Sequence, residues 1–286
     1  MLCGASVIGM VLLGCGEASG SPTPGPAGVT VSVLQYRSDY TIRRMQLQVS
    51  NAGPAPVTVT TARLNSTAFS AEAAWRSRDR ADETTIAPGT STDLPAPLPP
   101  SSCGGRSSDH FQTTARLDFR QADGSITRTA AQPVRDPFGS ITRVHTEDCR
   151  RAAALDIADL ALVNPLRRTT RHGRPVGLLD LRLAPSGRPG TLTVQSIGST
   201  TLLGPPKGQS WLVNRTVRAG SEPQTVTLEL RAARCDPHAI AEDKLGTVLP
   251  LTLRVDGGES GVVTVPADPQ LRIQIQRFVR DACAAT

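Results

Sequence analysis

The sequence predicts an all-β fold built from two copies of one disulfide-bonded domain. Short runs of alternating apolar and polar residues recur along the chain, and turns rich in Gly, Pro and Asn separate them. Each half of the chain also has one Trp followed by two Cys, at a nearly constant offset between the halves. These markers are Trp75, Cys103 and Cys149 in the first half and Trp211, Cys235 and Cys283 in the second. Several short strands with frequent turns predict a β-sandwich or a β-barrel.

The expected strands follow the period-two pattern in both copies. They are 29–36, 41–49, 57–64, 113–119, 125–129 and 140–145 in the first copy, and 179–183, 191–194, 225–230, 247–255, 262–265 and 271–279 in the second. We expect the join near Arg150–Ala154, directly after Cys149 and with almost no linker. A chain of 286 residues accommodates two domains of ordinary size, which we place at 29–150 and 151–286.

The run LQVSNAGPAPVTV, at residues 47–59, resembles the turn between the second and third strands of immunoglobulin-like modules in bacterial envelope proteins. This resemblance implies two tandem immunoglobulin-like β-sandwich domains. It also implies core positions for Trp75 and Trp211, because a core Trp packs against a disulfide in that family. The spacing from each Trp to its cysteines differs from that of an antibody domain, which leaves the strand positions open. A resemblance at the level of the fold implies little about function.

The six cysteines fall into two groups. Cys3 lies in the expected signal segment and Cys15 follows it, so four cysteines remain, as expected for a disulfide protein in an oxidising compartment. Four cysteines allow three pairings. The repeat selects Cys103–Cys149 and Cys235–Cys283, because each pair then stays within one copy. A metal site is the rival interpretation, although the sequence has no CxxC or HxxxH spacing.

The N-terminus predicts export. Residues 1–14 have no charged side chain and are mostly small or apolar, as in a secretion signal peptide. The string Leu-Leu-Gly-Cys that ends at Cys15 resembles the bacterial lipobox, although no Lys or Arg precedes the apolar run. The resemblance implies a covalent diacylglycerol on Cys15, no other cofactor, and anchoring to the outer face of the bacterial cytoplasmic membrane. Residues 15–28 then form a flexible tether; the alternative is an ordinary core helix with a buried Cys.

The net charge of +6 comes almost entirely from Arg, since Lys207 and Lys244 are the only lysines among 31 basic residues. Such a composition resembles the coding bias of a GC-rich, actinobacterial genome. A basic surface is attracted to anionic lipid headgroups or wall polymers. Two Trp, two Tyr and five Phe are too few aromatics to predict a nucleic-acid partner. The basic run Arg167–Arg174 is expected to be an exposed hairpin loop, or else a polymer-binding patch.

One stretch of the second copy has a constellation of polar side chains that suits a ligand or a metal. Its members are Asp236, His238, Glu242 and Asp243. A helical turn that starts at Asp236-Pro237 places the imidazole and the Glu242 carboxylate on one face, four residues apart. The alternative is a capped helical turn beside the disulfide. The run CDPHA also resembles uncharacterised actinobacterial lipoproteins of this two-part kind.

Three functions remain open from the sequence. The leading hypothesis is a membrane-anchored envelope lipoprotein that binds or scaffolds another envelope protein or an anionic surface polymer. The second is an exported small-ligand or metal-binding protein that uses the His238 and Glu242 region. The third is an exported hydrolase, which requires a Ser or Cys nucleophile within hydrogen-bond reach of a His. The sequence has no GxSxG, SxxK, HExxH or P-loop motif, so we expect no enzyme.

Overall fold

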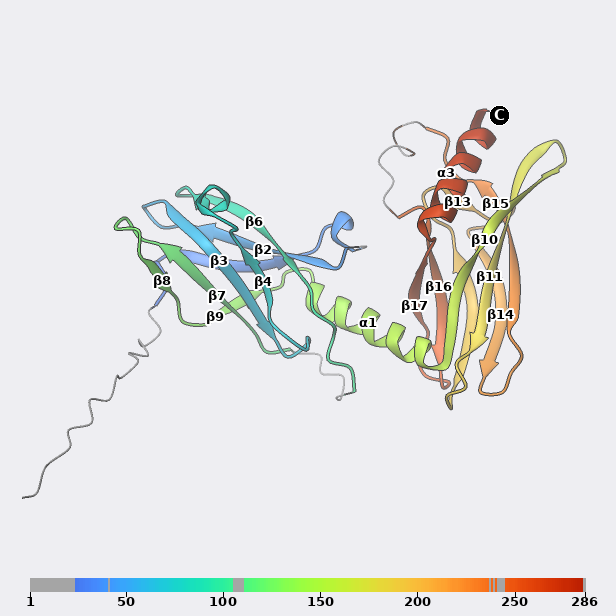
Figure 1. The fold of residues 1–286 in the computed structure, drawn as a ribbon, viewed down its shortest axis with the longest axis horizontal. Helices are drawn as coiled ribbons and strands as arrows, with labels where there is room; N and C mark the ends of the chain where they lie inside the picture. The colour runs from blue at the N-terminus through green and yellow to red at the C-terminus, as the bar shows by residue number, and fades with distance from the viewer. Residues whose placement is uncertain are drawn as a thin grey trace, which may run out of the picture.

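Two β-rich halves lie on either side of one long helix in the computed structural model, which describes residues 24–40, 42–104, 111–236, 238, 240 and 245–284 (Figure 1). The first half contains β1 (Val29–Leu34), β2 (Arg44–Asn51), β3 (Val57–Ser66), β4 (Ala73–Arg76), β5 (Thr84–Ile86), β6 (Thr90–Pro97), β7 (Thr113–Arg120), β8 (Ile126–Arg128) and β9 (Gln132–Arg135), with short 3-10 turns η1 (Arg37–Asp39) and η2 (Arg80–Asp82). Helix α1 (Ser140–Ile157) follows. The second half contains β10 (Ala158–Arg171), β11 (Arg174–Pro185), β12 (Thr191–Gly198), β13 (Leu203–Gly204), β14 (Ser210–Arg218), β15 (Gln224–Ala232), β16 (Val248–Val255), β17 (Gly261–Pro266) and α3 (Pro269–Ala284).

The two halves share one order of strand pairing. The order β1-β2-β6 in the first half corresponds to β10-β11-β15 in the second, and β4-β3-β7 corresponds to β14-β12-β16. Trp75 lies opposite Ala62 of β3, and Trp211 lies opposite Ile197 at the matching place in β12. The repeat that the Trp and Cys markers indicate therefore extends to the strand pairing. The expected fold is confirmed in its coarser form, as a mostly β structure with sandwich-like sheets.

The halves differ in how their sheets close. In the first half β9 pairs with β7 and, in parallel, with β1, which joins all its strands into one sheet. In the second half the corresponding strand β17 pairs with β16, and the described strands form two separate sheets. Alternating side chains point inward, as the period-two pattern predicts, and build one apolar core in each half.

The expected strand at 140–145 is wrong, because this segment begins helix α1. The Asp136 carboxylate accepts hydrogen bonds from the backbone N–H groups of Ser140 at 2.8 Å and Ile141 at 2.9 Å, which satisfies two donors that a helix start leaves unpaired. The helix then continues through Ala152, Ala153 and Ala154, all strong helix formers. The expected join at Arg150–Ala154 therefore lies inside a continuous helix.

The expected strand at 271–279 is also wrong, because it forms helix α3. Asp268 caps this helix by accepting the N–H of Leu271 at 2.8 Å, and Pro269 occupies the first helical position. This backbone hydrogen bond lowers the pKa of the Asp268 carboxyl below its ordinary value. The buried residues recur at helical spacing, whereas Ile273, which strand alternation would bury, is 54% exposed. The buried set is Leu271, Ile275, Phe278, Val279 and Ala282.

Both expected disulfides form, and they occupy equivalent places. Cys103–Cys149 joins the segment after β6 to α1, and Cys235–Cys283 joins the segment after β15 to α3. Each half is thus a mostly β structure with sandwich-like sheets, and its C-terminal helix is tied back to them by a disulfide. Two disulfides indicate an oxidising, extracytoplasmic compartment. Among the helices of the described residues, none is long and apolar enough to cross a membrane.

Candidate functional site

Helix α1 is shared by the cores of both halves. Its N-terminal residues Ile141 and Val144 belong to the first core, and its C-terminal residues Ala154 and Ile157 belong to the second. At about 1.5 Å per residue, its 18 residues span roughly 27 Å. A single helix that is buried at both ends acts as a strut, so the two halves are held in a defined arrangement.

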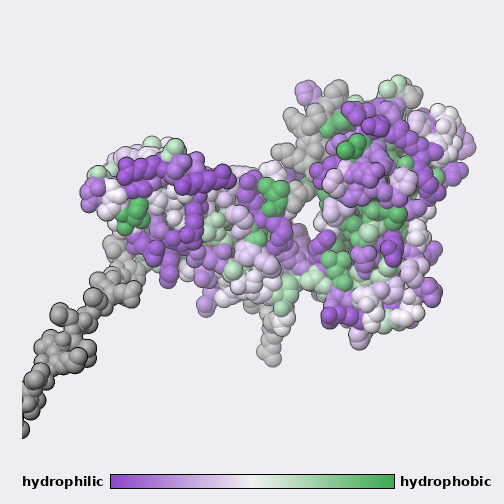
Figure 2. All heavy atoms as spheres, in the orientation of Figure 1, coloured by the Kyte–Doolittle hydropathy of each residue, from purple (hydrophilic) through white to green (hydrophobic). Residues whose placement is uncertain are grey.

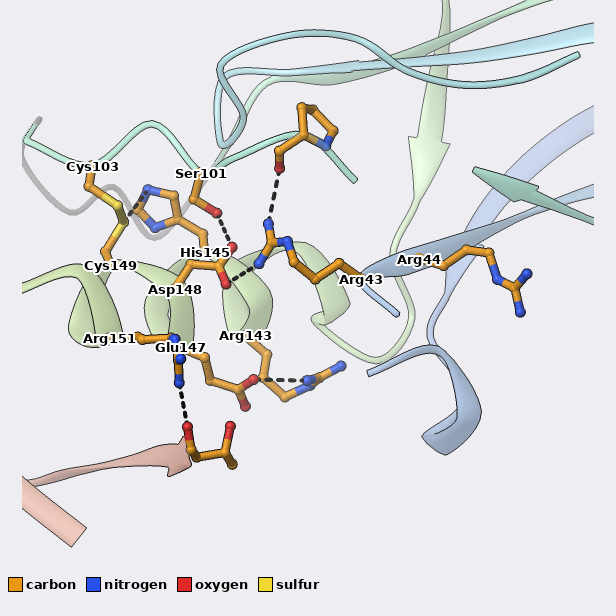
Figure 3. Close-up of polar contacts among 12 residues, drawn as sticks. Arg43, Arg44, Ser101, Cys103, Arg143, His145, Glu147, Asp148, Cys149 and Arg151 are labelled. Carbon is orange, nitrogen blue, oxygen red and sulfur yellow. Dashed lines mark hydrogen bonds and ion pairs between the residues drawn. A yellow bond between two sulfur atoms is a disulfide. The ribbon is translucent and has the colours of Figure 1, made fainter. Parts of the chain in front are cut away.

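Polar contacts fix the strut to the first half (Figure 3). Asp148 forms an ion pair with Arg43 and accepts a 2.6 Å hydrogen bond from the Ser101 hydroxyl. Arg43 also donates to the carbonyl of Pro99 at 3.1 Å. The backbone of Arg43 is left-handed, with a φ of 48°, which is uncommon for a residue other than Gly. This turn directs Arg43 toward α1, while the next residue, Arg44, points away from it in Figure 3.

Contacts at the other end fix the strut to the second half. Arg151 donates to the backbone carbonyl of Thr264 in β17. The Arg150 guanidinium lies over Gly261, where a Cβ atom would stand 2.0 Å from its Cζ. In the second half, α1 thus contacts β17. This strand corresponds to β9, which joins the strands of the first half into one sheet.

A groove of about 700 Å³ lies between the halves, and we call it the central groove. One wall comes from the first half, around η1 and the start of β2, and the second comes from β16, β17 and the start of α3. Side chains of α1 line the groove between these walls. This volume falls within the range of about 300–1,000 Å³ that is typical of small-molecule sites. Figure 2 shows the molecule hollowed between the two halves, with hydrophobic surface on the second half beside the hollow.

The charges that line the central groove are predominantly positive. Five arginines face two carboxylates, Glu147 and Asp148. Both carboxylates already have partners, because Asp148 pairs with Arg43, and Glu147 lies 3.4 Å from the Arg143 guanidinium. The remaining arginines are Arg37, Arg151 and Arg272. The groove therefore has an excess of positive charge.

The three remaining guanidinium groups differ in their contacts. Arg151 donates to a backbone carbonyl, and no carboxylate of the described residues forms an ion pair with it. Within the described residues, Arg37 and Arg272 have no ion pair, and both side chains belong to exposed residues. These two arginines are therefore the ones best placed to bind an anion from solution.

Tyr40 contributes an aromatic ring to the wall of the first half. The Arg143 guanidinium lies 4.6 Å from the centroid of this ring, and it donates to the Gln35 side chain at 2.6 Å. Tyr40 as a whole residue is 40% exposed. Stacking between the cation and the ring restricts both side chains and holds the aromatic face at the groove.

The disulfide beside α1 brings a His close to a Cys. His145 Nε2 lies 3.5 Å from Cys149 Sγ and 3.2 Å from the Ser102 carbonyl oxygen, and its ring packs against Phe111. A Cys–His pair is the geometry of a thiol nucleophile. Here the sulfur is bonded to Cys103, so it holds no thiol to deprotonate. This pair gives no support to the hydrolase hypothesis.

The constellation expected in the second half is placed only in part. The Asp236 carboxylate lies 2.9 Å from the Arg234 guanidinium, and His238 is exposed. Glu242 and Asp243 lie outside the described residues. Within the part of the chain that the structure describes, no group of three or more His, Cys, Asp or Glu side chains gathers to hold a metal.

The basic run 167–174 lies at the exposed end of the β10–β11 hairpin, but it is mostly paired strand and not the expected loop, since only His172 and Gly173 form the turn. Three of its arginines pair with carboxylates: Arg167 with Asp180, Arg168 with Asp281, and Arg171 with Glu229. Within the described residues these pairs compensate three of the four arginines of the run and leave only Arg174 without an ion pair, whereas three arginines of the central groove have none.

The two tryptophans singled out in the sequence are buried or partly buried in the structure. Trp211 is buried, and its indole N–H donates to the Glu229 carbonyl at 2.8 Å. Trp75 is partly buried against the first core. Cys15 lies outside the described residues. The groove residues escaped the sequence analysis, because they come from segments far apart in the chain and form no local motif.

Comparisons with known proteins give no assignment. No protein-family model and no curated protein matches this chain. A red sea bream transglutaminase structure matches at 11% identity and a TM-score of 0.23, over 85% of this chain and 32% of that one, so this chain spans about a third of its length. The calcium-binding domain CBD12 of CALX1.1 matches at 9% identity and a TM-score of 0.20, over 85% and 87%. Spo0M, a sporulation control protein from Bacillus subtilis, matches at 11% and 0.21, over 91% and 99%. Similarities this low support no functional argument.

Proposed function

We propose that this protein is an extracytoplasmic, membrane-tethered binding protein that holds an anionic ligand in the central groove. The observation that carries the proposal is the excess of arginine there: five guanidinium groups face two carboxylates that are both paired. Guanidinium groups bind phosphates and carboxylates through paired N–H donors. The ligand class agrees with an anionic component of the cell envelope.

We further propose that each half is an immunoglobulin-like module. The support is the strand order, in which a three-stranded arrangement, β1-β2-β6 or β10-β11-β15, accompanies a second one that starts β4-β3-β7 or β14-β12-β16. Immunoglobulin-like sandwiches have this division into two antiparallel sheets. Such modules present binding surfaces at their ends and junctions, and the central groove lies at a junction.

The proposed tether is the lipid on Cys15, supported by the lipobox resemblance and by the two disulfides that indicate export. Replacing Cys15 with Ala is expected to release the protein from the membrane fraction, because acyl chains provide the anchoring free energy. Fractionation of cells into membrane and soluble material measures this release. Continued tight membrane association of Cys15→Ala would contradict the lipid anchor and would leave the groove proposal in place.

Binding of anionic probes tests the groove. We expect Arg37→Gln combined with Arg272→Gln to weaken binding of short-chain polyphosphate or lysophosphatidylglycerol by roughly tenfold, since each exposed arginine contributes about 0.7 kcal/mol through its ion pair with the ligand. The matched control combines Arg76→Gln with Arg218→Gln, which removes the same charge from exposed positions outside the groove lining. Isothermal titration calorimetry at low ionic strength gives the affinities. Equal losses in both double variants, or no binding of either probe, would overturn the proposed function.

A further inference from the structure

We propose that the ligand of the central groove is an anionic amphiphile, a molecule with one phosphate or carboxylate headgroup and one long apolar chain. This inference rests on the proposed function, because it names the chemical class of ligand for the same groove. It follows from the combination of an apolar wall with a cationic rim, which a hydrophilic anion alone does not explain.

The apolar wall is the outward face of β16 and β17. The inward face of these strands is fully apolar, as a sandwich requires, and Leu249, Leu251 and Val263 are buried in the core. The outward positions of an antiparallel sheet that faces water are normally polar. Here they include Val248, Pro250, Val262 and Pro266, which all line the groove.

Helix α1 covers this outward face only in part. Arg151 reaches the carbonyl of Thr264, but Val262 in the same strand remains 44% exposed. On the opposite side of the groove Tyr40 is 40% exposed, and the largely buried Leu98 also lines this wall. The apolar surfaces of the two halves therefore meet at one groove, and within the described residues they are partly open to solvent. Exposed apolar surface gathered in this way marks an interaction site.

Charge complementarity selects the headgroup of the ligand. Arg37 comes from the first half and Arg272 from the second, so both walls bring a guanidinium that has no ion pair within the described residues. A neutral lipid would leave these cations unpaired. A polyanion without an apolar part would leave Val262 and its apolar neighbours in contact with water. A single-chain anion satisfies both parts of the groove, and the volume of about 700 Å³ suits a molecule of that size.

Four probes separate the contributions of chain and charge. The full chain with Cys15→Ala, which removes its own acyl chains as competitors, is titrated with lysophosphatidylglycerol, with a monoacylglycerol of the same chain length, with glycerol 3-phosphate and with short-chain polyphosphate. Concentrations stay below those at which micelles form. We expect lysophosphatidylglycerol to bind at least tenfold more tightly than each of the other three probes.

Two variants locate the chain in the groove. Val262→Gln is expected to weaken lysophosphatidylglycerol binding about tenfold, because it removes apolar contact area, and to leave polyphosphate binding unchanged. Leu212→Gln is the matched control, since Leu212 is 80% exposed on β14 and does not line the groove.

Each outcome separates the inference from the function that it rests on. Binding of polyphosphate or glycerol 3-phosphate as tight as that of lysophosphatidylglycerol would overturn the amphiphile and retain an anion site. Equal binding of the monoacylglycerol, or equal losses in Val262→Gln and Leu212→Gln, would also overturn it. Failure of every anionic probe to bind in a manner that depends on Arg37 and Arg272 would overturn the proposed function itself.

Discussion

Replacing Cys235 and Cys283 with Ser is expected to lower the free energy of unfolding of the second half by about 4 kcal/mol. The two cysteines are separated by 48 residues, and closing a loop of this length removes that much conformational freedom from the unfolded chain. In the folded chain the bond ties the last turn of α3 to the segment after β15. Cys283 itself is partly buried against the second core. Few single changes outside a core have an effect of this size.

The two tryptophans make this loss measurable one half at a time. Each half has one Trp, so Trp75→Phe leaves Trp211 as the reporter of the second half, and Trp211→Phe leaves Trp75 as the reporter of the first. Urea titration followed by fluorescence then gives the free energy of unfolding for each half. The internal control is Cys103→Ser with Cys149→Ser, whose separation of 46 residues predicts a similar loss in the first half. A loss below about 1 kcal/mol would show that loop closure is not what stabilises the second half.

The sequence was sufficient for the disulfides and for about half of the strands, because these depend on patterns that stay local or repeat. It did not predict β4, β5, β6 and β9 in the first half, or β10, β13 and β14 in the second. Strand alternation identified β1, β2, β3 and β7, and the second copy showed the same pattern for the counterparts of β2, β3 and β7 but not for β10, the counterpart of β1. Helix α3 was predicted as a strand because its first residues fit both the strand period of two and the helical period of 3.6. Leu271, Ile273 and Ile275 alternate as in a strand, but Asp268-Pro269 before them is a helix start, and Phe278 and Val279 continue the helical spacing. The cap was the available signal, and the burial of Phe278 confirms that it outweighs the alternation.

The central groove could not be predicted from the sequence, for a different reason. Its arginines come from η1, the turn before β2, α1 and α3, and nothing in their spacing along the chain brings them together. Only the arrangement of the halves by α1 does so. One signal was present, since Val248 and Pro250 flank the inward-facing Leu249 and make that stretch of β16 apolar on both faces. A strand that is apolar on both faces requires a second covering. Helix α1 covers the outward face of β16 only in part. The sequence alone does not indicate this, because it does not show where α1 lies.

Breaking the strut is the second change with a large expected effect. Ala153 is exposed and lies between Cys149, which is bonded to the first half, and Ala154, which is buried in the second core. A Pro at this position removes one helical hydrogen bond and collides with the preceding turn, at a cost of about 3 kcal/mol to the helix. Since both ends of α1 remain held by their own cores, we expect each half to stay folded and the helix to kink or break between them.

We expect Ala153→Pro to change both the shape of the protein and its affinity for the ligand. Small-angle X-ray scattering is expected to show a broader distribution of distances between the halves. Affinity for lysophosphatidylglycerol should fall in proportion to the fraction of molecules in which the two walls still face each other, so that tenfold fewer competent molecules give tenfold weaker binding. Ala153→Gln is the matched control, because it keeps the helix and changes the same exposed position. If Ala153→Pro leaves both scattering and affinity unchanged, then contacts such as Arg151 with Thr264 hold the halves without the help of a continuous helix, and the groove does not depend on the strut.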